Sequence, residues 1–376
     1  MRQRISAIQL IVISLELLLA LPFGLALSKL SIGGVAWILG GMASGGLVLR
    51  ACRVLYNYSA RPNRTARTIG EALVGLMIGS SIVHGNLTGV ASELPVFAFL
   101  TFFILLSGTF IGYIYSRISQ TNLLTAMLAT VPGSVGIMSS IAADYGRNVS
   151  LVALVQVIRV TMVVLLIPVV ARVSVGNGGN TITFPLNNNF FQLNISYFLL
   201  LFLVLITTSL GVRLASIFRI PAAPFFGSLI VGISFNPLLD LFFFIPNFDF
   251  SPPPLLSLIG QLLLGITIGE YWVSQPPLGK RTIGYALISV AMTLGSGFIA
   301  AVLAMFLTNW DWLTCMLVTA PGGAPEIILV SLALHHNVEI VTAGHLVRLL
   351  AINGSLPIWV FLFRHLERRL SDLGND

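Results

Sequence analysis

The sequence predicts an all-α polytopic membrane protein, and three observations support this fold class. Of the 376 residues, 56% are hydrophobic and only 9% are charged, and the mean hydropathy is +0.95. Soluble domains carry about 25% charged residues, so this chain could not cover the surface of a water-facing body. Twelve apolar stretches run along the chain, and a motif of its first half returns in its second half.

The apolar stretches form two groups of six. A helix needs roughly 20 apolar residues to cross the hydrocarbon core of a bilayer. The stretches cover about 7–28, 32–49, 68–88, 94–116, 121–142 and 149–171, and then 196–217, 221–238, 254–272, 283–308, 311–334 and 338–363. The first resembles a signal peptide, but it is longer than the roughly 15 residues of a signal h-region and contains Glu16 and Pro22, so we expect a retained helix.

An uncharged segment rich in Gly and Asn, 176–189, separates the two groups. It predicts four regions along the chain. These are membrane repeat 1 (1–172), an extracytoplasmic linker (173–195), membrane repeat 2 (196–363) and a cytoplasmic tail (364–376). The two cysteines lie far apart in no metal-type or redox-type spacing, so we expect free thiols.

The internal repeat is clearest around a Pro-Gly pair. Leu124-Thr125-x-Met127-Leu128-x-Thr130-x-Pro132-Gly133 returns 189 residues later as Leu313-Thr314-x-Met316-Leu317-x-Thr319-x-Pro321-Gly322. The register continues without a gap, so that Arg159 matches Arg348. The protein is therefore predicted to be a duplicated unit.

Basic residues predict that the two copies have opposite orientations in the membrane. The loop after the second stretch carries five arginines, whereas its counterpart, 239–253, has no Lys or Arg. Loop 89–93 has none, whereas its counterpart has Lys280 and Arg281, and Arg117 has no basic counterpart either. Because Lys and Arg collect in cytoplasmic loops, these matched loops lie on opposite sides, as in inverted-topology repeats.

Inverted repeats require an odd number of crossings per copy. We therefore expect about five spans per copy plus one helix broken by Pro-Gly, at 121–142 and 311–334, which is either a re-entrant hairpin or a discontinuous full span. With the N-terminus inside, 16 of the 20 Lys and Arg residues are cytoplasmic, and so is the C-terminus. This distribution predicts a multi-pass membrane protein with both termini on the cytoplasmic side.

The two Pro-Gly elements are the first candidates for a binding site. Proline removes a backbone donor and glycine loosens the helix, so a break is expected at each element. Paired breaks at matched positions favour a midplane site, where the N-termini of half-helices suit an anion. The alternative is a proline kink filled by packing. The candidate residues in the two elements are Pro132, Gly133, Ser134, Pro321, Gly322 and Gly323.

Charged residues inside the spans are the second set of candidates. Arg159 and Arg348 lie about ten residues into their helices, which is roughly 15 Å deep. Gln156 and His345 precede them by three residues and share their helix face. Each Arg is expected either to contact a substrate or counter-ion, or to cap loose carbonyls of the broken helix, and the two roles can coexist. A charge at this depth requires partners or a polar cavity.

The acidic residues differ between the copies. Glu326 lies in the second break, where the first copy has Ile137. It is expected to pair with Arg348 or His345, or to carry a proton. Glu16, inside the first helix, is a second candidate proton carrier, with local pairing as its alternative.

These motifs resemble the AbrB family of bacterial membrane proteins, named for regulation of the aidB gene, which carry a duplicated membrane module. The family's pattern is Ala-Thr, Pro-Gly-Gly, an acid three residues on, and then Gln or His with Arg three residues later. The residues that fit it in the second copy are Thr319, Pro321, Gly322, Gly323, Glu326, His345 and Arg348. Those that fit it in the first copy are Ala129, Thr130, Pro132, Gly133, Gln156 and Arg159, whereas Ser134 and Ile137 depart from it. The resemblance implies a location in the bacterial cytoplasmic (inner) membrane. Labels attached to the family are a regulator of gene expression and an ammonia monooxygenase. The first implies an indirect effect on transcription, and the second implies metal and oxygen chemistry.

We predict a secondary transporter of a small anionic solute or coupling ion, embedded in the lipid bilayer. The sequence has no nucleophile elbow, Walker loop, HExxH or CxxC motif, so no enzyme activity, cofactor or metal is expected. No nucleic acid partner is expected, and assembly with further copies of the chain is left open. The alternative is a membrane regulator that acts indirectly, and the third interpretation is a membrane-bound monooxygenase.

Overall fold

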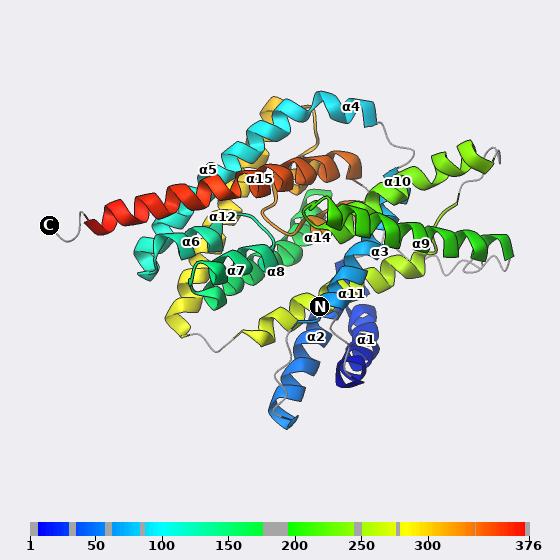
Figure 1. The fold of residues 1–376 in the computed structure, drawn as a ribbon, viewed down its shortest axis with the longest axis horizontal. Helices are drawn as coiled ribbons and strands as arrows, with labels where there is room; N and C mark the ends of the chain where they lie inside the picture. The colour runs from blue at the N-terminus through cyan, green and yellow to red at the C-terminus, as the bar shows by residue number, and fades with distance from the viewer. Residues whose placement is uncertain are drawn as a thin grey trace. The chain divides into compact units, whose positions relative to one another are not determined.

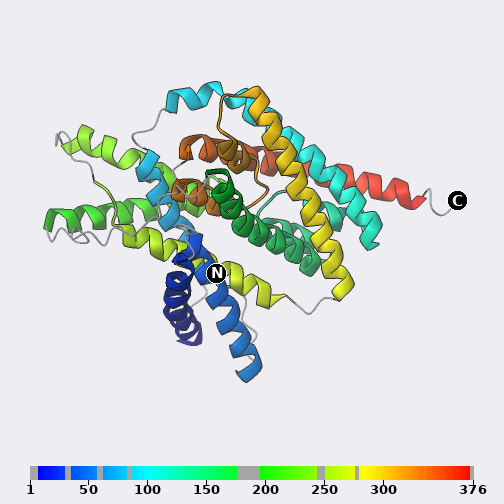
Figure 2. The ribbon, with the colours of Figure 1, turned by 180° about the vertical axis from the view of Figure 1, so that it is seen from behind.

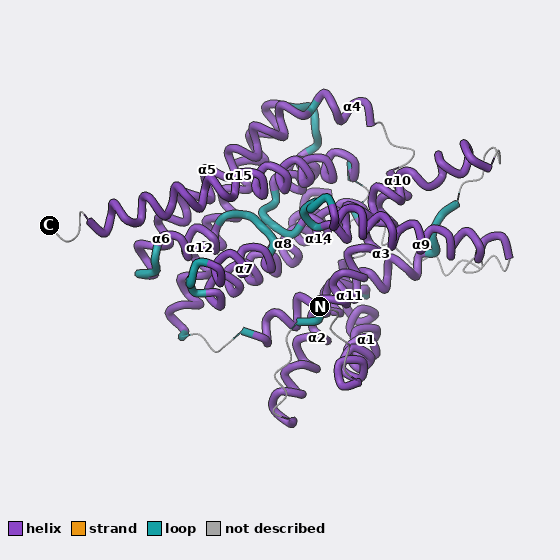
Figure 3. Tube along the Cα trace, in the orientation of Figure 1, coloured by secondary structure: helices purple, strands orange, loops and turns teal. Residues whose placement is uncertain are grey.

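The computed structural model describes residues 7–29, 35–56, 62–82, 87–175, 195–243, 250–275, 279–334 and 336–372. In these ranges the chain is helix, turn or loop, and they contain no strand (Figure 3). Nine of the helices described there are long and apolar enough to cross a membrane. The chain is a multi-pass helical protein (Figure 1).

The apolar stretches of the sequence return as helices with altered ends. The helix expected at 68–88 begins earlier, at Arg64, because the Asn63 side chain accepts hydrogen bonds from the backbone N–H groups of Thr65 and Ala66. The last helix continues to Asp372, so most of the expected tail is helical. Of the linker expected at 173–195, residues 173–175 end the helix Val149–Val175 and residue 195 begins the helix Ile195–Ile217. The rest of this linker lies outside the described residues.

The helices form two compact units, and each unit takes segments from both halves of the sequence. The first unit contains residues 1–86, 168–274 and 328–338. Its helices are α1 (Ala7–Ser28), α2 (Val35–Tyr56), α3 (Arg64–Ile82), α9 (Ile195–Ile217), α10 (Ala223–Phe243) and α11 (Pro254–Ser274).

Helices from the two halves pair crosswise in the first unit. α2 packs on α11, and α10, the counterpart of α2, packs on α3, the counterpart of α11. Glycines allow both contacts, because a Cβ at Gly265 would overlap the carbonyl oxygen of Ile38, and one at Gly79 would overlap that of Leu229. α1 packs on α2, as α9 packs on α10. The same packing therefore occurs twice.

The second unit contains residues 87–167, 275–327 and 339–376. Its helices, of which α8 and α14 continue into the first unit, are α4 (Leu87–Ser92), α5 (Leu94–Ser119), α6 (Leu123–Thr130), α7 (Val135–Asp144), α8 (Val149–Val175), α12 (Lys280–Leu307), α13 (Trp312–Thr319), α14 (Ala324–Ala333) and α15 (Val338–Asp372). The long helices α5 and α12 pack against each other, as the view from behind shows (Figure 2). α6 packs on α5, and its counterpart α13 packs on α12.

Candidate functional site

Two pairs of short helices, α6 with α7 and α13 with α14, carry the Pro-Gly elements. α6 ends at Thr130 and α13 ends at Thr319. The next residues, Val131 and Ala320, are extended, with ψ of 130° and 126°. Each stands directly before a proline, whose ring disfavours helical backbone at the preceding residue. The chain therefore leaves the helix at the same point in both copies.

The starts of α6 and α13 are also equivalent. The side chain of Asn122 accepts a hydrogen bond from the backbone N–H of Thr125, and Asp311 does the same for Thr314. Such N-caps stabilise a helix by about 1 kcal/mol. These caps explain why an eight-residue helix begins at each of these points.

A threonine fastens the end of each short helix to the neighbouring long helix. Thr130 Oγ1 lies 3.0 Å from the carbonyl oxygen of Gly108 in α5 and 3.0 Å from that of Ala126 in its own helix. Thr319 Oγ1 lies 3.0 Å from the carbonyl oxygen of Gly297 in α12. Thr319 and Gly297 follow Thr130 and Gly108 by the same offset of 189 residues. The duplication is thus visible in individual hydrogen bonds.

Arg159 of α8 lies at the end of α6. Its guanidinium donates to the carbonyl oxygens of Val131 at 3.3 Å and Gly133 at 3.2 Å, and to Gln156 Oε1 at 2.6 Å. The amide of Gln156 in turn donates to the carbonyl oxygen of Leu128 at 2.9 Å. Together the two side chains bind carbonyl groups that have no partner within the ended helix.

Arg348 of α15 occupies the equivalent place at the end of α13. It donates to the carbonyl oxygen of Ala320 at 2.9 Å and lies 2.6 Å from His345 Nδ1. His345 Nε2 lies 2.9 Å from the carbonyl oxygen of Leu317. These are the hydrogen bonds expected of the capping role that the sequence left as one alternative.

The two arginines are buried near each other. Arg159 is 1% exposed and Arg348 is 3% exposed, and their charges are close enough to repel. Among the described residues, Glu326 is the one buried acid of this unit. The three side chains leave one formal positive charge in the interior.

The N-termini of α7 and α14 follow the breaks. Ser134 is the N-cap of α7 but makes no side-chain hydrogen bond to it. Glu326 lies in the first turn of α14, and its carboxylate lies against Gly323. The first N–H groups of a helix have no intrahelical partner and carry partial positive charge. Both termini therefore add to the positive character of the site, and Glu326 offsets part of it.

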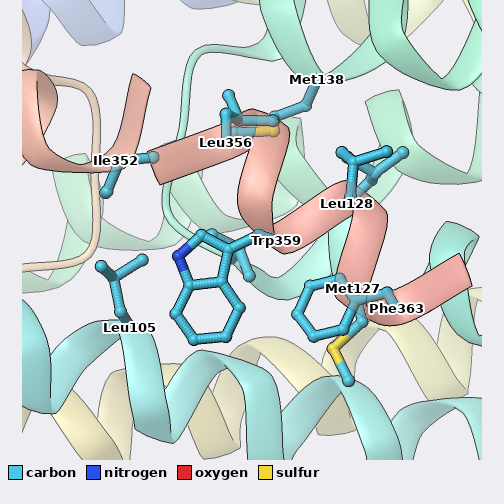
Figure 4. A pocket seen from close by; sticks show the side chains of 10 residues that line it. Leu105, Met127, Leu128, Met138, Ile352, Leu356, Trp359 and Phe363 are labelled. Atoms are coloured by element: carbon cyan, nitrogen blue, oxygen red, sulfur yellow. The ribbon is translucent and has the colours of Figure 1, made fainter. Parts of the chain in front are cut away.

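A cavity beside the first break is lined by apolar side chains. A cavity of about 20 Å³ lies between α5, α6, α7 and α15 (Figure 4), which is room for about one water molecule. Trp359, Phe363, Met127 and Leu128 are among its lining side chains. A charged solute would find no polar group on these walls, so this cavity does not suit an anion.

The structure brings most candidate residues into the second unit. Pro132, Gly133, Gln156 and Arg159 lie together, and so do Pro321, His345 and Arg348. α8 reaches the second break, where Val163 lies beside Gly322. Glu16 belongs to the first unit.

Two residues near Glu16 were not recognised in the sequence. Glu270 is an acid inside an apolar helix, which was the available signal, and it lies close to Glu16. Asn63 donates its backbone N–H to Glu270. No group of three or more His, Cys, Asp and Glu side chains placed to hold a metal occurs within the described ranges.

The fold and the two buried arginines define a multi-pass helical membrane protein in which equivalent contacts occur in both halves of the chain. The family model described as "Transition state regulatory protein AbrB" matches residues 37–364, and the chain belongs to this AbrB family. It is 24% identical over 316 residues to a Bacillus subtilis (strain 168) protein named "Uncharacterized protein YhjN", covering 82% of each chain. It is also 24% identical over 300 residues to an Escherichia coli (strain K12) protein named "Putative regulator AbrB", covering 77% of this chain and 80% of that one.

Proposed function

We propose that the protein is a secondary transporter of a small anionic solute, with its binding site at the paired breaks. The observation that carries this proposal is the pair of buried, mutually repelling guanidinium groups of Arg159 and Arg348. Their hydrogen-bond partners in the structure are uncharged carbonyl, amide and imidazole groups. An anion between them would relieve the repulsion.

Charge burial makes this role physically reasonable. One Arg at the centre of a membrane helix costs at least about 2.5–3.5 kcal/mol on insertion scales. Carbonyl groups lower that cost without neutralising the charge, whereas an anionic ligand does both. The starts of α7 and α14 present further N–H groups, which bind anions in many proteins.

We further propose that the two halves are inverted-topology repeats in the bacterial cytoplasmic membrane, with both termini inside. The loop charges support this arrangement, and so does the crosswise packing of α2 on α11 and α10 on α3. Near the C-terminus, Glu367 binds Arg147 at 2.6 Å and Arg364 lies over the ring of Tyr145, as expected if these groups share one side. In this arrangement an ion or solute gradient drives transport.

The test of the proposed site is thermal stability of the detergent-purified protein with a panel of small organic and inorganic anions. An anion at about 100 times its Kd should add about 2.7 kcal/mol to the folded state. We expect Arg159→Gln and Arg348→Gln to lose this stabilisation. The control is Arg281→Gln, which changes an exposed arginine of the same unit and should keep it.

Transport is then measured with the stabilising anion in proteoliposomes. Uptake by the wild type and by Arg281→Gln, with none by Arg159→Gln, supports the proposal. If no anion stabilises the wild type, or if the arginine variants are stabilised as the wild type is, the anion site is wrong.

A second candidate is a regulator of gene expression that acts from the membrane, because the Escherichia coli relative carries the name of a regulator. A transporter that changes the level of a cellular signal would have such an effect indirectly. Transcript levels in cells that express Arg159→Gln distinguish the two. Regulation that is lost together with anion binding follows from transport, whereas regulation that survives in the variant indicates a separate function.

A further inference from the structure

The first unit contains a buried acid, Glu16 of α1. Glu16 of α1 is 0% exposed, and neither oxygen of its carboxylate has a hydrogen-bond partner among the described residues. An ionised carboxylate in such surroundings is costly, and its neutral form avoids that cost. Local pairing was the alternative role for Glu16. It is wrong, because no described residue binds the Glu16 carboxylate.

A second buried acid lies beside it. Glu270 of α11 is 2% exposed, and the carboxyl groups of Glu16 and Glu270 are close enough to interact electrostatically. α1 and α11 both pack on α2, and α1 also touches α11, which explains how residues of distant sequence meet. Unlike Glu16, Glu270 has a donor, because the backbone N–H of Asn63 binds its Oε2 at 2.8 Å.

The basic side chains of α2 and α3 either bind other groups or are exposed. On α2, Arg53 donates to the carbonyl oxygen of Val273 and Arg50 is exposed. On α3, Arg67 binds Glu71 at 2.7 Å and Arg64 is exposed. The remaining titratable side chains on these helices are Lys29 at the end of α1, Cys52 and Tyr56 on α2, and Tyr271 on α11.

We propose that Glu16 and Glu270 form a proton-binding site in which the two carboxyl groups hold one proton between them. The proton resides on Glu16, which has no donor to stabilise a negative charge, and the charge resides on Glu270, which receives the Asn63 N–H. This inference rests on the proposed function, because it names the proton as the coupling ion of the same transporter.

Release of the proton breaks the O–H bond of Glu16 and leaves its electron pair on the carboxylate. The site then changes from one negative charge to two. The proton passes to water, and the added repulsion between the carboxylates disfavours the arrangement in which α1 touches α11. Proton loss is thereby linked to a change in packing, which is what coupling requires.

The geometry favours a proton over a metal cation. Hard cations take about six oxygen ligands. The two oxygens of Glu16 are available as ligands. The Glu270 oxygen that faces Asn63 already accepts a hydrogen bond. One proton needs only one oxygen and removes one charge.

Infrared spectroscopy of the full-length protein in lipid tests this proposal without any solute. The C=O stretch of a protonated carboxyl group is distinct from the carboxylate bands. We expect this band at neutral pH in the wild type and its loss in E16Q. The control E71Q should keep it, since Glu71 is also buried but is paired with Arg67.

The variant E270Q tests whether the two carboxyl groups share a site. Without the charge of Glu270, deprotonation of Glu16 becomes easier, so the band should disappear at a lower pH than in the wild type. A band that survives in E16Q overturns the proposal, and an unchanged titration in E270Q does too. Because Glu→Gln keeps the shape of the side chain, we expect both variants to fold, and a Tm within a few degrees of the wild type verifies it.

The outcome is independent of the anion site. If E16Q loses the band but no anion binds, the proton site stands and the transporter proposal fails. If anion binding is present and E16Q keeps it while uptake no longer responds to a pH gradient, both stand. If the uptake of E16Q responds to the gradient as the wild type does, the coupling role is wrong.

Discussion

His345 accepts a hydrogen bond from Arg348 through Nδ1, at 2.6 Å. An arginine only donates and a carbonyl oxygen only accepts, so the single ring hydrogen of His345 is on Nε2, which donates to Leu317. In the first copy, Gln156 does the same with an amide. Its Oε1 accepts from Arg159 at 2.6 Å, and its Nε2 donates to Leu128. Positions 156 and 345 therefore both need a side chain with one hydrogen-bond donor and one acceptor.

This equivalence predicts that His345→Gln is tolerated. The amide supplies the same donor and acceptor, so we expect a loss of less than about 1 kcal/mol in the free energy of unfolding. His345→Leu leaves the buried Arg348 and the Leu317 carbonyl without this partner and should cost about 1–3 kcal/mol. Denaturation in mixed micelles measures both. Equal losses in the two variants would show that the hydrogen bonds do not matter.

The threonines at the ends of α6 and α13 should contribute equally. Thr130→Val and Thr319→Val each remove a hydrogen bond to a neighbouring helix, so each should lower the unfolding free energy by about 0.5–1.5 kcal/mol. Thr207→Val is the control, because the Thr207 hydroxyl bonds carbonyl oxygens of its own helix, those of Leu203 and Val204. A loss at Thr207 as large as that at Thr130 would contradict the role of the interhelical contact.

The close contact between α2 and α11 should be sensitive to one methyl group. In Gly265→Ala the new Cβ meets backbone atoms of Ile38, which cannot turn away as a flexible side chain can. We expect a loss of about 1–3 kcal/mol from overpacking. Gly295→Ala on α12 meets nothing within 4 Å and should be neutral or stabilising. The ranking of the two melting temperatures decides this prediction, and the reverse order would refute it.

The inverted orientation of the halves predicts opposite labelling of matched loops. In a variant with alanine at Cys52 and Cys315, we place single cysteines at Ser92 or Gly279, both exposed. A membrane-impermeant maleimide applied to intact spheroplasts should label S92C, and G279C only after permeabilisation. Labelling of both positions from the same side would show that the repeats are parallel.

Much of the fold was predictable because a helix that spans lipid needs a long apolar stretch, and because a proline disfavours helical backbone at the residue before it. The end of α6 at Thr130 follows from Pro132. The offset between the copies also allowed Arg159 and Arg348 to be matched before their contacts were known. The capping of carbonyls was one of two roles that the sequence left open.

Other features depend on tertiary contacts that one sequence does not encode locally. The crosswise pairing of α2 with α11 could not be predicted, because several helices carry glycines and the sequence does not say which two helices meet at them. Glu16 and Glu270 are far apart in the chain, and only the fold brings them together. The continuation of α15 to Asp372 follows no apolar pattern, since its last turns are polar.

The contact between α2 and α11 can form only late in the synthesis of the chain. About 200 residues separate the end of α2 from the start of α11. At about 5–20 residues per second, the ribosome needs roughly 10 to 40 seconds to make them. During that interval the glycine face of α2 has no α11 to meet and is surrounded by lipid, α1 or the insertion machinery. The membrane must therefore hold the early helices in an unfinished assembly until the second half arrives.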